Sequence, residues 1–162
     1  SPNGKLLGLG SGLYNFDNST GEITFWQSLI LMSSYAFTFS PQSRYLYTTT
    51  GFFGDLIRYD LEAPDVAASK ETLESLFFSL NIGLMQIGPD GNIYYLNQEL
   101  DFVGLGINGL DVIRCPDSPN PIVEKSFFQF PTDPLNEQYT GLPNFADHIF
   151  HNLQFEIEIN KS

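Results

Sequence analysis

Short apolar runs alternate along most of the chain with breaks rich in glycine, proline and small polar residues. Residues 44–50 (RYLYTTT), 55–60 (DLIRYD) and 92–97 (NIYYLN) carry the aromatic, aliphatic and β-branched residues that suit a pleated, half-buried surface. The pattern predicts short β-strands joined by tight reversals. We expect the remaining strands at residues 5–10, 13–16, 21–29, 35–40, 83–88, 110–115 and 125–131.

A proline-containing turn precedes three of these strands. Turn residues such as asparagine, aspartate and glycine accept the backbone angles of a tight reversal, so each turn can join two strands as a hairpin. The turns contain Asn3-Gly4, Gln42-Ser43 and Asp90-Gly91, and their prolines are Pro2, Pro41 and Pro89, with a weaker fourth copy at Pro143. The copies recur about every 40 to 55 residues, a spacing typical of four-stranded β-propeller blades.

The repeat predicts an all-β fold made of four-stranded antiparallel blades, about three to four in number. We interpret residues 1–162 as a single partial β-propeller domain with repeat units at about 1–38, 39–86, 87–140 and, in part, 141–162. Propellers usually have 4 to 8 blades, and an open one exposes strand edges. We therefore expect the chain to be the C-terminal portion of a larger propeller, completed by sequence or chains beyond it.

Residues 65–80 (DVAASKETLESLFFSL) depart from the strand pattern. Alanine, lysine, glutamate and leucine favour a helix, and Asp65 could cap its first turn. Because strand units flank this segment on both sides, we expect a loop with a single turn of helix.

The charge balance excludes several classes of function. The chain has 19 acidic and 7 basic residues, a net charge of −12, whereas nucleic-acid binding needs clustered lysine and arginine. No apolar run approaches the roughly 18 to 20 residues that cross a bilayer. Cys115 is the only cysteine, so neither an internal disulfide nor a cysteine-based zinc site can form.

Two groups of residues could in principle hold a metal ion. His148 and His151 are spaced to share one side of a helical turn, with Asp147 as the only further ligand nearby, and the alternative is an ordinary polar turn or edge strand. The other group consists of acidic residues around the third repeat unit. It could bind calcium only if the loops that carry these residues brought their carboxylate oxygens together. It consists of Asp90, Glu99, Asp101, Asp111 and Asp117. Because Asp90 already serves a hairpin turn, we assign no metal or cofactor site.

Catalytic chemistry has equally little support in the sequence. A glycosidase needs two facing carboxylates, and a propeller hydrolase would require residues such as Asp55, Asp60, Asp90 and Asp101 to converge near its central channel. Trp26 and the other aromatic residues could stack on a sugar ring, although packing between blades is the simpler interpretation. No G-x-S-x-G elbow is present for a serine nucleophile. We therefore assign no catalytic residue.

The ordered series FTFSPQSRYLYTTTGFFGDLIRYDLEAPDVAAS, GLMQIGPDGNIYY and TGLPNF resembles the WD40-like, YVTN-type β-propeller region of large secreted or surface proteins of Bacteroidota. The likeness covers residues 1 to 150. It implies immunoglobulin-like modules and a type IX secretion or gliding-motility domain downstream, and no catalytic motif of that family maps onto this chain. The stretch around Cys115 departs from the family pattern, so no function is inherited by that residue.

Two functions from different classes follow as hypotheses. The first is a non-catalytic, secreted or cell-surface interaction module, whose propeller scaffold presents loops to a protein or glycan partner, or to the remainder of its own propeller. The second is part of a propeller hydrolase that acts on polysaccharide. The positions of the acidic residues distinguish the two hypotheses.

Overall fold

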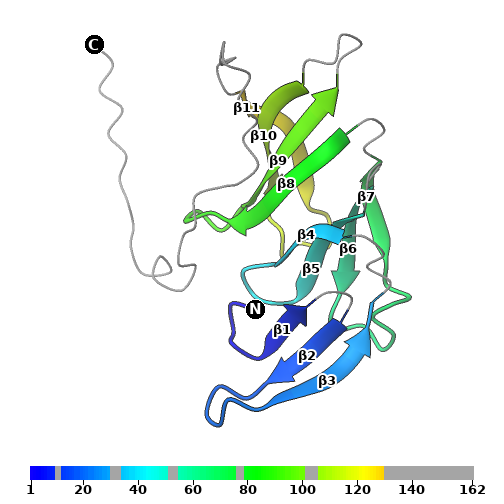
Figure 1. Cartoon of the computed structure of the whole chain (residues 1–162), viewed down its shortest axis with the longest axis vertical. Helices are drawn as coiled ribbons and strands as arrows, with labels where there is room; N and C mark the ends of the chain where they lie inside the picture. The colour runs from blue at the N-terminus through cyan, green and yellow to red at the C-terminus, as the bar shows by residue number, and fades with distance from the viewer. Residues whose placement is uncertain (10–11, 30–33, 51–54, 76–78, 101–105, 130–162) are drawn as a thin grey trace.

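The chain folds into three antiparallel β-sheets stacked one above another (Figure 1). The computed structural model describes residues 1–9, 12–29, 34–50, 55–75, 79–100 and 106–129, which contain eleven strands and no helix. The first sheet contains β1 (Leu6–Leu9), β2 (Gly12–Phe16) and β3 (Ile23–Ser28). The second contains β4 (Ser34–Phe39), β5 (Tyr45–Thr50), β6 (Asp55–Asp60) and β7 (Glu71–Ser75). The third contains β8 (Ser79–Ile87), β9 (Ile93–Leu100), β10 (Gly106–Arg114) and β11 (Ile122–Gln129).

Each sheet is a simple meander in which strands adjacent in sequence pair antiparallel. The all-β prediction is confirmed, and each predicted run overlaps a strand. The second and third sheets each have four strands, and their first strands, β4 and β8, lie side by side. The sheets span residues 6–28, 34–75 and 79–129, so each of the last two begins with the strand that precedes its proline turn.

The segment predicted as loop with a turn of helix contains an unexpected strand. Residues 65–69 form a hydrogen-bonded turn in which the amide of Ser69 donates to Asp65 O (3.2 Å) and the amide of Ala68 donates to Asp65 Oδ1 (3.0 Å). Glu71–Ser75 then form β7, which pairs with β6. The helix-favouring composition gives way here because β6 offers a ladder of backbone partners, and local propensity is too weak to outweigh them.

The three proline turns share one geometry. The amide of the fourth residue donates to the carbonyl of the first, at 3.0 Å for Gly4 to Ser1, 2.8 Å for Ser43 to Ser40 and 3.0 Å for Gly91 to Gly88. In each turn the fourth residue has a positive φ, of 68°, 61° and 76° respectively. This is the arrangement of a type I turn followed by a left-handed residue, which is common in hairpin loops. The three predicted turns at Pro2, Pro41 and Pro89 are therefore confirmed, whereas the fourth copy at Pro143 and the partial unit 141–162 lie outside the described residues.

The proline turns also contact one another across the sheets. The amide of Asn3 donates to Ser43 Oγ at 3.1 Å, which joins the first turn to the second. A methyl group placed on Gly91 would lie 3.9 Å from Pro41 Cγ, so the second turn lies against the third. The three turns consequently form a row along one side of the stack.

Two apolar clusters hold the stack together, and the second sheet contributes to both. Because successive residues of a strand point to opposite faces, neighbours on β5 and β6 belong to different clusters. The cluster between the first and second sheets contains Leu13, Leu29, Phe39, Leu46, Ile57, Tyr59, Leu61 and Val66, and Leu6, Trp26 and Phe37 pack against it. The cluster between the second and third sheets contains Ala36, Tyr45, Tyr47, Leu56, Met85, Ile93, Tyr95 and Ile113. The second sheet is thus buried on both faces.

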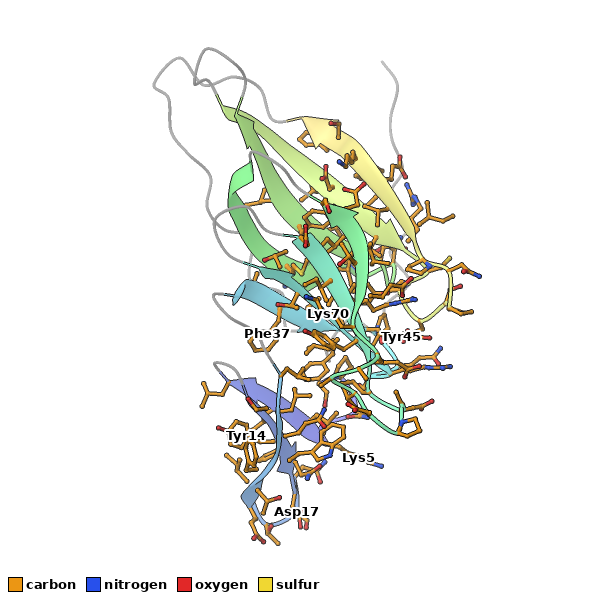
Figure 2. All side chains as sticks on the ribbon, turned by 90° about the vertical axis from the view of Figure 1, so that its right-hand side faces the viewer. Lys5, Tyr14, Asp17, Phe37, Tyr45 and Lys70 are labelled. Atoms are coloured by element: carbon orange, nitrogen blue, oxygen red, sulfur yellow. The ribbon has the colours of Figure 1, made fainter. Side chains whose placement is uncertain are left out.

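Gly8 allows the first sheet to approach the second. A Cβ atom at this position would lie 2.5 Å from Cε2 of Phe37, whose ring lies at the boundary between the two sheets (Figure 2). We predict that Gly8→Ala lowers the free energy of unfolding by about 1–3 kcal/mol, because the inserted methyl overpacks this contact.

The measurement is urea unfolding of Gly8→Ala, Phe37→Leu and the double variant. Since the smaller, flexible leucine relieves the contact, the double variant should lose less stability than the sum of the two single changes. Simple additivity would contradict the proposed contact.

Candidate functional site

Asp55 and Asp60, named as potential catalytic carboxylates, lie at opposite ends of the same strand. They are the first and last residues of β6, and Asp55 pairs with Ser75 whereas Asp60 pairs with Tyr45. Asp60 accepts a hydrogen bond from Arg44 Nη2 at 3.1 Å. Partial burial raises the pKa of Asp60, but hydrogen bonds from Arg44 and the Glu62 amide outweigh it, so the pKa lies below its usual value. Asp60 is thus an ionised ion-pair partner, separated from Asp55 by the length of β6.

Asp90 stabilises the turn that the sequence assigned to it. Its carboxylate accepts hydrogen bonds from the Asn92 amide (3.1 Å), Asn92 Nδ2 (2.6 Å) and Tyr94 Oη (2.8 Å). Burial raises the pKa of Asp90, but the hydrogen bonds from Tyr94 and Asn92 lower it by more. The pKa of Asp90 therefore lies below its usual value. Burial, together with the bond to Asp90, raises the pKa of Tyr94 to about 12.

The other acidic candidates are dispersed or lie outside the described residues. Asp111 is buried and accepts a hydrogen bond from the Ser126 amide at 2.7 Å, while Asp117 accepts one from the Gln42 amide at 3.0 Å. Glu99 belongs to the backbone of β9, but its side chain is not described. Asp101, Asp147, His148 and His151 lie outside the described residues. Within the described part of the chain, no three histidine, cysteine or acidic side chains are grouped to hold a metal ion.

Cys115 and Trp26 have structural surroundings. Cys115 is exposed, has a positive φ of 50°, and accepts the Ser118 amide at 2.8 Å, so it opens the turn between β10 and β11. Trp26 packs against the cluster between the first and second sheets. For Trp26, the packing interpretation is therefore confirmed.

The strongest polar cluster in the described residues was not found from the sequence. Arg58 lies between Ile57 and Tyr59 on β6 and is only 6% exposed, although it carries a charge. Its guanidinium donates to Ser118 O (2.8 Å) and Pro119 O (2.9 Å) in the turn between β10 and β11, and its Nε donates to Glu71 Oε2 (3.0 Å) on β7. The guanidinium carbon also lies 4.5 Å from the centroid of the Tyr45 ring. We call this set of contacts the Arg58 junction.

Tyr47 and Gln42 extend the Arg58 junction. Tyr47 Oη donates to Pro116 O at 2.7 Å, and burial raises the pKa of this phenol to about 12. Together with the Gln42 bond to Asp117, these contacts attach the turn at residues 115–119 to the second sheet. A single arginine between Ile57 and Tyr59 is the signal from which the sequence could have indicated a buried polar contact, since a buried arginine needs partners.

The face of the third sheet opposite the second carries the clearest candidate binding surface. Arg114 Nε donates to Glu124 Oε2 at 2.6 Å, and the guanidinium lies 5.3 Å from the ring centroid of Phe127. The rings of Tyr94 and Phe127 have centroids 5.9 Å apart, and Phe127 is 44% exposed. We call these four residues the Phe127 surface. A partly exposed aromatic ring beside an ion pair can stack on a sugar or pack against a protein side chain.

No family model matches the sequence, and no curated protein matches it. Within the residues that the structure describes, there is no helix long and apolar enough to cross a membrane.

We predict that Arg58→Met destabilises the fold by about 2–3 kcal/mol, because it leaves two carbonyls and one carboxylate without their donor. This loss of stability is smaller than that expected for breaking a fully buried ion pair, because the Glu71 side chain is half exposed. The control is Arg44→Met, which removes exposed ion pairs to Asp60 and Glu62 and should change stability little. Urea unfolding of both variants measures the difference, and equal losses would contradict the importance of the junction.

We predict that Asp90→Asn flattens the acid side of the stability profile. Because the folded pKa of Asp90 is lowered, its contribution is complete above the usual aspartate pKa of about 3.9 and is lost as pH falls through the folded value. The wild type should therefore lose stability more steeply than the variant below about pH 4. Urea midpoints measured from pH 7 down to pH 2 compare the two proteins. Parallel profiles would show that the carboxylate contributes nothing to this dependence.

Proposed function

We propose that this chain is a non-catalytic interaction module, built as a section of a β-propeller that presents loops and sheet faces to a protein or glycan partner. The observation that carries the proposal is the repeated stacking of similar sheets. Three antiparallel meanders pack face to face, their proline turns form a row, and β4 lies beside β8. Successive propeller blades share these features.

The acidic residues support a scaffold more than a hydrolase. Asp60 pairs with Arg44, Asp90 caps its own turn, and Asp117 links two sheets. Each of these carboxylates is therefore already engaged by protein donors, and no observation among the described residues favours the polysaccharide hydrolase. A secreted or cell-surface location in Bacteroidota, with type IX secretion, is part of the proposal and rests on the sequence resemblance alone.

The Phe127 surface provides the test of a glycan partner. Affinity electrophoresis of the chain through gels that contain soluble polysaccharides measures retention, and a reducing-end assay on the same mixtures measures cleavage. We expect retention without cleavage, weakened about tenfold by Phe127→Ala, because a central aromatic contact often carries most of the binding energy. Phe25→Ala is the matched control, since Phe25 is 61% exposed and also packs against a tyrosine, Tyr14.

The outcomes separate the alternatives. Release of reducing ends would contradict a non-catalytic function. Retention that Phe127→Ala and Phe25→Ala weaken equally would exclude the Phe127 surface as the site. If no polysaccharide is retained, the glycan partner is excluded and the proposal is restricted to a protein partner.

A further inference from the structure

A bulge interrupts the pairing of β11 with β10 next to the Phe127 surface. The register shifts between Leu110 and Val112, so that Asp111 on β10 faces residues 125–127 of β11. Ser126, in the middle of the bulge, has a φ of 53°. A positive φ is uncommon for a residue other than glycine, and strained positions of this kind gather at binding and catalytic sites. Bulges are also frequent beside such sites, where they redirect a side chain.

The bulge turns the ring of Phe127 to the outer face of the third sheet. Successive side chains of a regular strand point to opposite faces. Glu124 belongs to the Phe127 surface on the outer face, whereas Lys125 points to the second sheet, where its Nζ lies 3.0 Å from Glu74 Oε2. Continued alternation would direct Phe127 inward as well. Its ring centroid instead lies 5.9 Å from that of Tyr94, and Phe127 is 44% exposed.

Asp111 binds the bulge from the inner face of the sheet. Its partner on β9, Tyr95, belongs to the apolar cluster between the second and third sheets, and Asp111 is only 1% exposed. Asp111 Oδ1 accepts the Ser126 amide at 2.7 Å. Because a buried polar group is costly without a hydrogen bond, this contact stabilises the strained residue that redirects Phe127.

We propose that Asp111 is the positioning residue of the Phe127 surface. It fixes the bulge at Ser126 and thereby keeps the ring of Phe127 on the outer face, where a sugar ring can stack on it. An aromatic ring that is fixed before the partner arrives loses less conformational entropy on binding, so the bulge increases affinity without a contact of its own. The inference rests on the proposed function, since it concerns the glycan partner of this surface.

Affinity electrophoresis of the full chain tests the inference, in gels that contain the neutral polysaccharides hydroxyethyl cellulose, xyloglucan or galactomannan. Asp111→Ala removes the acceptor of the Ser126 amide and should weaken retention at least about threefold, because fewer molecules present the ring. Asp111→Asn keeps a side-chain oxygen that can accept this amide, so retention should stay within about twofold of the wild type. In the Phe127→Ala background, Asp111→Ala should have no further effect, because Asp111 acts only through the ring.

Thr48→Val is the matched control for a general loss of stability. Thr48 is also buried, and its Oγ1 donates to Ala36 O at 3.0 Å within the second sheet. This variant should lose stability in urea unfolding because it leaves a buried carbonyl without its donor. Its retention should nevertheless stay within about twofold of the wild type, because the bulge is intact.

Four results would overturn the inference while the wild type is still retained, and they leave the proposed function standing. They are wild-type retention of Asp111→Ala, an equal loss in Thr48→Val, an equal loss in Asp111→Asn, and a further loss when Asp111→Ala is added to Phe127→Ala. Fast hydrogen exchange of the Ser126 amide in the wild type would overturn it even if Asp111→Ala does not fold. If the wild type itself is not retained, the glycan partner is excluded and this inference is excluded with it.

Discussion

The guanidinium of Arg58 determines how the third sheet lies against the second. A buried charge is costly unless its donors are satisfied, and the planar fork of arginine can reach two carbonyls and a carboxylate at once. Ser118, Pro119 and Glu71 supply those acceptors, and the Tyr45 ring covers the cation. The acceptors come from two different sheets, so Arg58 is satisfied only when those sheets are in this one arrangement. Apolar burial is non-directional, so the directional hydrogen bonds of the Arg58 junction add a constraint that the apolar cluster beside it does not supply.

The second sheet packs against another sheet on each of its two faces. Its strands alternate residues directed to the first sheet with residues directed to the third, so each face carries an apolar cluster, and Arg58 adds a polar contact toward the third sheet. The first and third sheets retain large apolar side chains that are exposed, among them Phe25 and Ile23 on one and Ile122 and Phe127 on the other. A stack of apolar sheets ends stably only where its last face is covered or made polar. The exposed side chains therefore agree with a stack that continues into further packing partners.

The sequence predicted those parts of the fold that depend on neighbouring residues. Each proline turn requires a residue with a positive φ at its fourth position, and the glycines Gly4 and Gly91 indicate two of these positions in the sequence. Ser43 adopts a similar angle although it is not a glycine. β7 was not predicted, because its composition favours a helix and only pairing with β6 makes it a strand. The Arg58 junction joins residues about sixty positions apart, and no local pattern specifies which carbonyls a buried arginine will reach. The partners of Asp60 and Asp90 could not be identified from the sequence either. Carboxylates are abundant in this acidic chain, and only the fold shows that Asp60 pairs with Arg44 and that Asp90 binds Tyr94.

The pairing of the basic residues adds to the effect that the net charge has on anionic ligands. All three arginines of the sequence, Arg44, Arg58 and Arg114, pair with carboxylates of the same chain, and Lys125 pairs with Glu74. A phosphate group would have to displace one of these carboxylates while approaching a chain of net charge −12. Neutral ligands avoid that repulsion, and a sugar ring or an extended backbone binds through stacking and hydrogen bonds that need no free cation. The charge distribution is thus compatible with the neutral glycan partner proposed for the Phe127 surface, whose ring is partly exposed.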